Sequence, residues 1–269
     1  MKKIKLTKII ASSLIVASVL AFNPIGTYAT ETNVVQTTDA VVSTGESYFT
    51  VDSTTDAEAR VDKSDFMFNL STETITKYKG TDTEVVIPCR IKGIPGFSVT
   101  SIGKHAFSYC NGVKSIEISG SITNLDKDAF EQCSSLKNII VNDSNPYYAS
   151  YDGVLFDKSK TEIINYPEGK DNTSYVIPNG VIGIDDSAFY KCSNSLTSIT
   201  IPNGVTSIGI GAFQECSSLT SITIPSSVKS IGDEAFQDCT NAKFYVDSNN
   251  VKQLLINNGV DESKIILNV

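Results

Sequence analysis

The six cysteines are the most reactive side chains in this sequence. Five of them follow an Ala-Phe pair with two residues between, at Cys110, Cys133, Cys192, Cys216 and Cys239. A small apolar residue at one repeated position serves packing, so we expect a column of buried thiols. Disulfide bonds between neighbouring units, Cys110 with Cys133 or Cys216 with Cys239, stay open as the alternative. Cys89 lies outside the column and is predicted to be the exposed, reactive thiol.

The spacing of the metal-ligating residue types does not indicate a metal site. Zinc sites use closely spaced Cys-x-x-Cys or Cys/His groups, and the sequence has none. The single histidine, His105, occupies a variable position of the repeat, which weakens any catalytic triad built on it. Gly209-Ile210-Gly211 lacks the third glycine of a phosphate-binding loop. The sequence therefore predicts no metal, no cofactor and no catalytic residue.

Acidic residues offer two further kinds of chemistry. Asp143-Ser144-Asn145 and Asp247-Ser248-Asn249 begin like calcium loops, but the full set of oxygen ligands is missing. Glu84 and Glu117 fall on predicted strands, and two carboxylates on one face can act as a glycosidase pair. Since nothing singles out such a pair, a glycan hydrolase is the least favoured function.

The first 29 residues have the parts of a secretory signal peptide. Four lysines form a basic start, residues 9–22 are apolar, and Thr27-Tyr28-Ala29 gives a cleavage site. The apolar run of 14 residues is shorter than the roughly 20 residues of a membrane span. We expect cleavage after Ala29, an exported chain and no membrane span in it; a permanent membrane anchor is the alternative.

The charge of the chain argues against two classes of partner. The formal net charge is -8, and removal of a signal peptide with four lysines and no acidic residue takes it to -12. Binding to phosphate groups requires a basic surface. We therefore expect neither nucleic acid nor an anionic membrane surface as a partner.

The Ala-Phe pair sets a period along the chain. Its alanines are separated by 23, 59, 24 and 23 residues, at Ala106, Ala129, Ala188, Ala212 and Ala235. The gap of 59 is one repeat plus a longer irregular unit, residues 142–167. A fixed period of this length indicates a solenoid of stacked coils. We assign residues 30–62 to a flexible leader rich in Thr, Ser and Asp, 63–241 to the solenoid and 242–269 to a C-terminal cap.

The best-formed repeat, residues 219–239, indicates how each coil is built. In its short strand Ile222 and Ile224 are predicted to point inward, and Ser221 and Thr223 outward. Pro225 ends the strand, and Gly232 is predicted to permit a tight bend. We expect one strand per coil.

Both ends of the repeat region have sequences that suit caps. Residues 66–78 alternate like a strand or hairpin and lead into the first repeat strand at Glu84. Ser248 is predicted to cap a short helix, with Gly259 just past its end and a last strand at residues 265–269. These features predict an N-terminal β cap and a C-terminal α/β cap.

These residues carry a family resemblance. The pattern Ile-Pro-x-x-Val-x-x-Ile-Gly-x-x-Ala-Phe-x-x-Cys-x-x-Leu, with the interposed Asn145-Pro-Tyr-Tyr148 and Asp152-Gly-Val-Leu-Phe156, resembles the BspA-type leucine-rich repeats of bacterial surface proteins. The resemblance covers residues 66–269 and implies a mainly β, right-handed solenoid with short turns and helical segments. It also implies a secreted or surface location and a role in adhesion. The sequence has no sorting signal for wall attachment, no wall-binding module and no lipid-anchor cysteine, so we expect no stable anchor.

The outward positions of the strands form the candidate binding surface. They are Glu84 and Val86, Ser115 and Glu117, Asn138 and Ile140, Ile163 and Asn165, Ser174 and Val176, Ser198 and Thr200, and Ser221 and Thr223. Ile140, Ile163 and Val176 predict an apolar patch within a polar face, which is typical of a protein-binding site. Alternatively the irregular unit, with its tyrosines Tyr147, Tyr148 and Tyr151, folds over this patch and hides it.

The sequence as a whole predicts an exported, non-enzymatic binding protein. Its partner would be an extracellular protein or glycan, on a host matrix, on a host cell or on the bacterium's own envelope. The alternative is a structural envelope component that binds the bacterium's own wall polymers.

Overall fold

The computed structural model describes residues 19–21, 29–31, 65–91 and 97–268, in two compact units. The first unit, Met1–Tyr48, contains an antiparallel pair of short strands, β1 (Val19–Ala21) and β2 (Ala29–Glu31). The predicted signal peptide (1–29) and leader (30–62) lie, apart from these strands, outside the described residues. Within the described ranges, no helix has the length and apolar character needed to cross a membrane.

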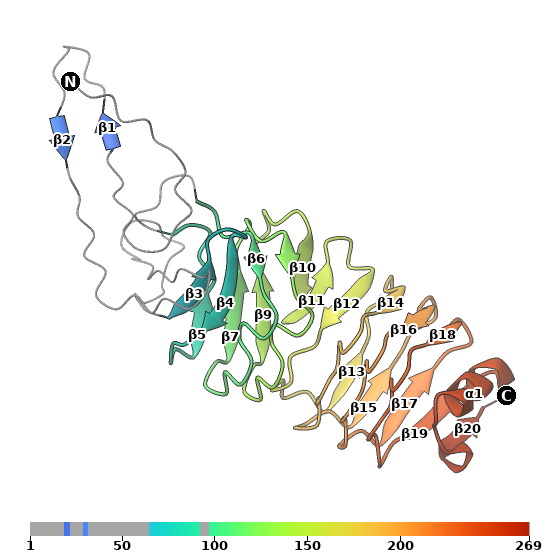
Figure 1. Cartoon of the computed structure of the whole chain (residues 1–269). Coiled ribbons are helices and arrows are strands. Elements are labelled where there is room, and N and C mark those ends of the chain that lie inside the picture. The colour runs from blue at the N-terminus through green and yellow to red at the C-terminus, as the bar shows by residue number, and fades with distance from the viewer. Residues whose placement is uncertain (1–18, 22–28, 32–64, 92–96, 269) are drawn as a thin grey trace. The chain divides into compact units, whose positions relative to one another are not determined.

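The described residues of the second unit, 65–91 and 97–268, form a solenoid of stacked coils (Figure 1). Each regular coil begins with the strand predicted from the repeat. In β17 (Ser221–Ile224), Ile222 and Ile224 are buried, and Ser221 and Thr223 point outward. We call these the first strands. The others are β5 (Glu84–Val86), β7 (Ser115–Ile118), β9 (Asn138–Val141), β13 (Ser174–Val176), β15 (Ser198–Thr200) and β19 (Lys243–Val246).

The prediction of one strand per coil is wrong, because a second strand of two residues follows the first corner. It is short because only the inward isoleucine or leucine and the residue before it pair with the next coil. The second strands are β6 (Ser101–Ile102), β8 (Asn124–Leu125), β14 (Gly183–Ile184), β16 (Ser207–Ile208) and β18 (Ser230–Ile231).

Parallel pairing between coils is interrupted at one place in the solenoid. The first strands form the sheets β5-β7-β9 and, with β20 (Ile265–Leu267), β13-β15-β17-β19-β20. The second strands belong to two other sheets. In β3-β4-β6-β8 they follow the N-terminal hairpin, and in β10-β11-β12-β14-β16-β18 they follow the irregular unit. Both series of strands are therefore divided at residues 142–167.

The irregular unit supplies three antiparallel strands, β10 (Tyr148–Tyr151), β11 (Val154–Asp157) and β12 (Glu162–Asn165). Three successive side chains of β11 are buried, which an amphipathic strand does not allow. Leu155 packs into the N-terminal hydrophobic core, whereas Val154 and Phe156 pack into the C-terminal one. The core of the solenoid is thus two clusters, with β11 between them.

The predicted caps are confirmed. β3 (Phe66–Asn69) and β4 (Thr74–Tyr78) form a hairpin that pairs with β6. Ser248 caps helix α1 (Asn249–Asn257) by accepting a hydrogen bond from the amide of Val251, and Gly259 beyond the helix has φ +83°. A short 3-10 helix, η1 (Glu262–Lys264), leads into β20.

Gly232 has a different role from the one predicted. Its φ is not positive, so the bend does not require glycine for its torsion angles. Instead, a Cβ at this position would lie 2.5 Å from the amide nitrogen of Ile210 in the preceding coil. Glycine is needed because two backbones approach closely, and Gly209 meets Asp186 at the same distance.

The column of buried thiols is confirmed at four of its five positions. Cys133, Cys192, Cys216 and Cys239 are buried, whereas Cys110 is half-buried. None of the six cysteines forms a disulfide bond. The thiols of Cys133, Cys216 and Cys239 each donate to the carbonyl of the phenylalanine in the preceding coil, at 2.9–3.0 Å. Cysteine therefore fills a small apolar space and satisfies a buried acceptor. Cys89, predicted to be exposed, is also half-buried.

Candidate functional site

The outward residues of the first strands form aligned rows, which we call the strand face. In the N-terminal half, one row is Glu84, Ser115 and Asn138, and the other is Val86, Glu117 and Ile140. Glu84, Asn138 and Ile140 are exposed, whereas Val86, Ser115 and Glu117 are half-buried. Val86 packs partly against the N-terminal core. The exposed part of this half therefore lies at its two edges.

In the C-terminal half, the rows are Ser174, Ser198 and Ser221, and Val176, Thr200 and Thr223. Both continue onto β19, through Lys243 and Tyr245. These two residues were missed by the sequence analysis, which treated residues 242–269 only as a cap. The alternation of Lys243 and Tyr245 with the buried Phe244 and Val246 is the signal that identifies them.

Ile163 and Asn165 are not part of the strand face. They belong to β12, which pairs with β14 among the second strands. Ile163, predicted to point outward, is fully buried in the C-terminal core. Asn165 is half-buried and lines a hollow described below. The error arose because the irregular unit shifts the strand order, so the position after Thr161 no longer corresponds to a first strand.

The hairpin turn of the irregular unit occupies the gap between β9 and β13. On one side, the amide of Ile139 donates to the carbonyl of Gly153 at 2.9 Å. Gly153 has φ +73°, and a Cβ there would lie 2.5 Å from the side-chain oxygen of Asn138. On the other side, Lys170, which is buried, donates to the carbonyl of Asp152 at 2.6 Å. The turn therefore connects β9 to the segment that leads into β13.

The two apolar residues that border this turn are open to solvent. Ile140 is 47% exposed and Val176 is 66% exposed. Of the tyrosines that were alternatively expected to cover them, Tyr147 and Tyr151 are themselves exposed, and Tyr148 packs partly against the N-terminal core. The irregular unit thus fills the gap in the sheet without burying either apolar side chain.

Carboxylates on the strand face have no arrangement that marks a reaction centre. Glu84 and Glu117 lie on adjacent strands but two residues out of register, because Glu84 pairs with Ser115 and Glu117 with Val86. Among the described residues, no group of three or more His, Cys, Asp or Glu side chains is placed to hold a metal ion.

A second feature, a hollow of about 330 Å³, lies among the turn segments that follow the second strands. It exists because the irregular unit lacks the Ala-Phe-x-x-Cys turn. Between the turns at residues 127–132 and 187–190, the chain makes only the short turn that contains Glu168. Gly169 brings this turn against the preceding coil, since its amide donates to the carbonyl of Leu136 at 2.9 Å.

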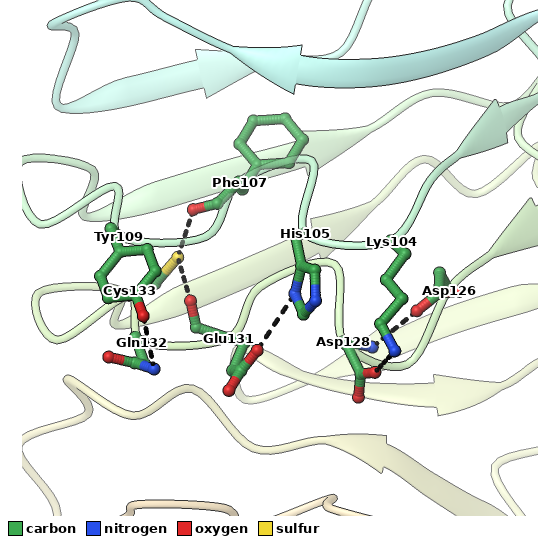
Figure 2. Close-up of polar contacts among 9 residues, drawn as sticks. All are labelled: Lys104, His105, Phe107, Tyr109, Asp126, Asp128, Glu131, Gln132 and Cys133. Carbon is green, nitrogen blue, oxygen red and sulfur yellow. Dashed lines mark hydrogen bonds and ion pairs between the residues drawn. The ribbon is translucent and has the colours of Figure 1, made fainter.

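Ion pairs order the rim of the hollow (Figure 2). His105 Nδ1 lies 3.0 Å from Glu131 Oε2, and Lys104 Nζ lies 3.0 Å from Asp128 Oδ2. Lys127, from the N-terminal half, reaches Asp186 of the C-terminal half at 2.9 Å. The hydrogen bond to Lys127 is the main reason that the pKa of Asp186 is lowered.

Comparisons with known proteins identify the repeat. Residues 93–172 and 166–258 match the family model described as "BspA type Leucine rich repeat region", with six copies. The comparison with curated proteins gave no match.

Several solved structures are similar to this chain. The pneumococcal vaccine antigen PcpA is 22% identical over 64% of this chain and 66% of its own, with a TM-score of 0.39. A leucine-rich repeat protein from Eubacterium ventriosum is 26% identical over 57% of this chain and 53% of its own, with a TM-score of 0.41. A third, from Bacteroides ovatus, is 24% identical over 78% of this chain and 55% of its own, with a TM-score of 0.41. The chain thus spans about half of the last two, and these similarities carry no argument about function.

Proposed function

The chain belongs to the BspA-type leucine-rich repeat family, and we propose on that premise that it is an exported, non-catalytic protein that binds an extracellular protein. The binding surface is the strand face, centred on Ile140 and Val176. Since the chain is a repeat solenoid, its aligned outward positions offer an extended surface that no single coil provides.

The exposure of Ile140 and Val176 is the observation that carries this proposal. Folding normally removes large aliphatic side chains from water, and both lie outward on a face half of whose residues are Ser, Thr or Asn. Ile140 lies on β9 and Val176 on β13, the first strands before and after the irregular unit. A partner that spans the irregular unit could cover both.

The test compares two double variants of the purified chain. Ile140→Asp with Val176→Asp places two charges on the proposed surface. Ile182→Asp with Ile210→Asp is the control, because these isoleucines are 51% and 54% exposed and lie outside the first strands. Retention is measured on immobilised extracellular matrix proteins, on host cells and on isolated bacterial wall.

The proposal requires that the wild type and the control are retained on a matrix protein or on host cells. Retention of the strand-face variant should be lower by about tenfold or more. Equal retention of both variants would place the binding surface elsewhere. Tight retention on isolated wall alone would support the alternative of an envelope component.

A further inference from the structure

We propose that the hollow on the turn side is a second binding site, which takes a single amino-sugar residue with a protonated amine. This site is separate from the strand face. It is formed by side chains from both halves of the solenoid, including Gln132 before the irregular unit, Glu168 within the short turn and Gln214 after it.

Both lysines that line the hollow already have carboxylate partners. Lys104 and Lys127 lie 3.0 and 2.9 Å from Asp128 and Asp186, and His105 Nδ1 lies 3.0 Å from Glu131. The carboxylate of Glu168, which also lines the hollow, has no hydrogen bond or ion pair to any residue that the structure describes. A cation is therefore the group that complements the hollow, and an anionic ligand would meet an unpaired negative charge.

The remaining lining suits a polyhydroxylated molecule. Gln132 donates its amide to the hydroxyl of Tyr109 at 3.1 Å, which leaves its carbonyl oxygen to accept (Figure 2). Gln214 donates its amide to Gln237, which likewise leaves its carbonyl oxygen to accept. Ser187 adds a hydroxyl to the lining. These neutral acceptors match the hydroxyl donors of a sugar ring better than an apolar alkyl chain.

The size and the aromatic residues of the hollow limit the ligand further. Ligand pockets measure roughly 300–1,000 Å³, and this hollow of about 330 Å³ lies at the lower end. That volume suits one pyranose ring. Tyr190, which is half-buried, is the aromatic residue of the lining against which the C–H face of a sugar can pack, whereas Phe130 is buried in the N-terminal core.

The environment of Glu168 agrees with a site that lacks its cation. Burial raises the pKa of this carboxyl group; Lys191 lowers it, and Glu131 and Glu215 raise it. The ionised form is therefore less favoured than that of a free carboxyl group. A bound ammonium group would supply the missing opposite charge.

Three sugars with the same ring test the proposal. Glucosamine carries the amine, N-acetylglucosamine replaces it with a neutral amide, and glucose has a hydroxyl there. Binding is measured by calorimetry and by amide chemical shifts, on the wild type, Glu168→Gln and Glu117→Gln. Glu117 is the matched control because it lies on the strand face.

We expect glucosamine to bind best, to shift amides at residues 127–132 and 187–190, and to lose about tenfold or more in affinity with Glu168→Gln. The Glu117→Gln control and the strand-face double variant should bind it normally, which separates this site from the proposed function. Equal affinity for the three sugars, no affinity for glucosamine, or unchanged affinity of Glu168→Gln would overturn the proposal.

Stability provides a second readout that a merely structural glutamate would not give. A carboxyl group with a raised folded-state pKa stabilises the fold when protonated, and this stabilisation is lost as the pH rises through that pKa. Without ligand, Glu168→Gln should therefore be more stable than the wild type at neutral pH and equal to it at acidic pH. A loss of stability at neutral pH would show that Glu168 supports the fold, and would contradict the proposal.

Discussion

At the scale of single residues, the position before the Ala-Phe pair keeps one backbone conformation in four of the five turns while its side chain varies. His105, Ser187 and Glu234 occupy the same place in three coils and have φ of 56°, 57° and 58°. The aligned residue of another coil, Gly211, has φ 58°. L-residues adopt this left-handed region at an energetic penalty. The repeat therefore carries backbone strain at this position wherever the residue is not glycine. The surface position predicted for His105 is confirmed, and its ion pair with Glu131 follows from that choice.

Replacement of Glu234 by glycine tests this strain. Glu234 is exposed, so Glu234→Gly should remove strain without loss of packing and raise the free energy of unfolding by about 0.5–1 kcal/mol. Its exposed neighbour Asp233 has an ordinary φ, and Asp233→Gly should lower the stability by up to about 1 kcal/mol. Urea unfolding of the two variants checks the signs; the same sign for both would contradict the role of φ.

The thiols provide a second test at this scale. Burial raises the pKa of Cys133 to about 12, and the pKa of Cys216 is raised in the same way. Because thiolates are the reactive form, the four buried cysteines should not react with a thiol reagent in the native chain, while Cys89 and Cys110 react slowly. Unfolding without reductant should expose six thiols. Counts of four or two would show that the disulfide alternatives form instead.

At the scale of elements, the first strands and caps followed from the sequence, and the second strands did not. Alternation of Ile222 and Ile224 with polar residues is a local signal, whereas a two-residue strand such as Ser230–Ile231 exists only through pairing with its neighbours. The strand face was predictable for the same reason, except at Ile163 and Asn165, which lie on β12, and at Lys243 and Tyr245, which were missed. The hollow was not, since it results from a missing turn that only the stacked structure reveals.

The close approach of coils at Gly232 gives a prediction at this scale. Gly232→Ala would force the Cβ against the backbone of Ile210 and should lower the free energy of unfolding by about 1–3 kcal/mol. Gly112 is the matched control, since a Cβ there has no neighbour within 4 Å. Gly112→Ala should leave the thermal midpoint nearly unchanged. Equal midpoints for both variants would show that the coils can separate slightly without loss.

At the scale of the whole solenoid, the irregular unit both joins and separates two hydrophobic cores. Regular coils contact only their neighbours, so stability passes along the stack through each interface. At the irregular unit the interface contains β11, whose two faces are buried in different cores, and ion pairs such as Lys127–Asp186 and Lys137–Asp171 cross it. We expect the two halves to unfold with different free energies.

Two adjacent residues of β11 can separate the halves experimentally. Leu155 and Phe156 are both fully buried, but Leu155 packs in the N-terminal core and Phe156 in the C-terminal core. Leu155→Ala should lower the opening free energy of amides in β7, and Phe156→Ala that of amides in β17, each by about 3 kcal/mol. Native-state hydrogen exchange resolves both, and each variant is the control for the other. If either variant lowers the protection of both strands equally, the solenoid unfolds as one cooperative unit and β11 is no boundary.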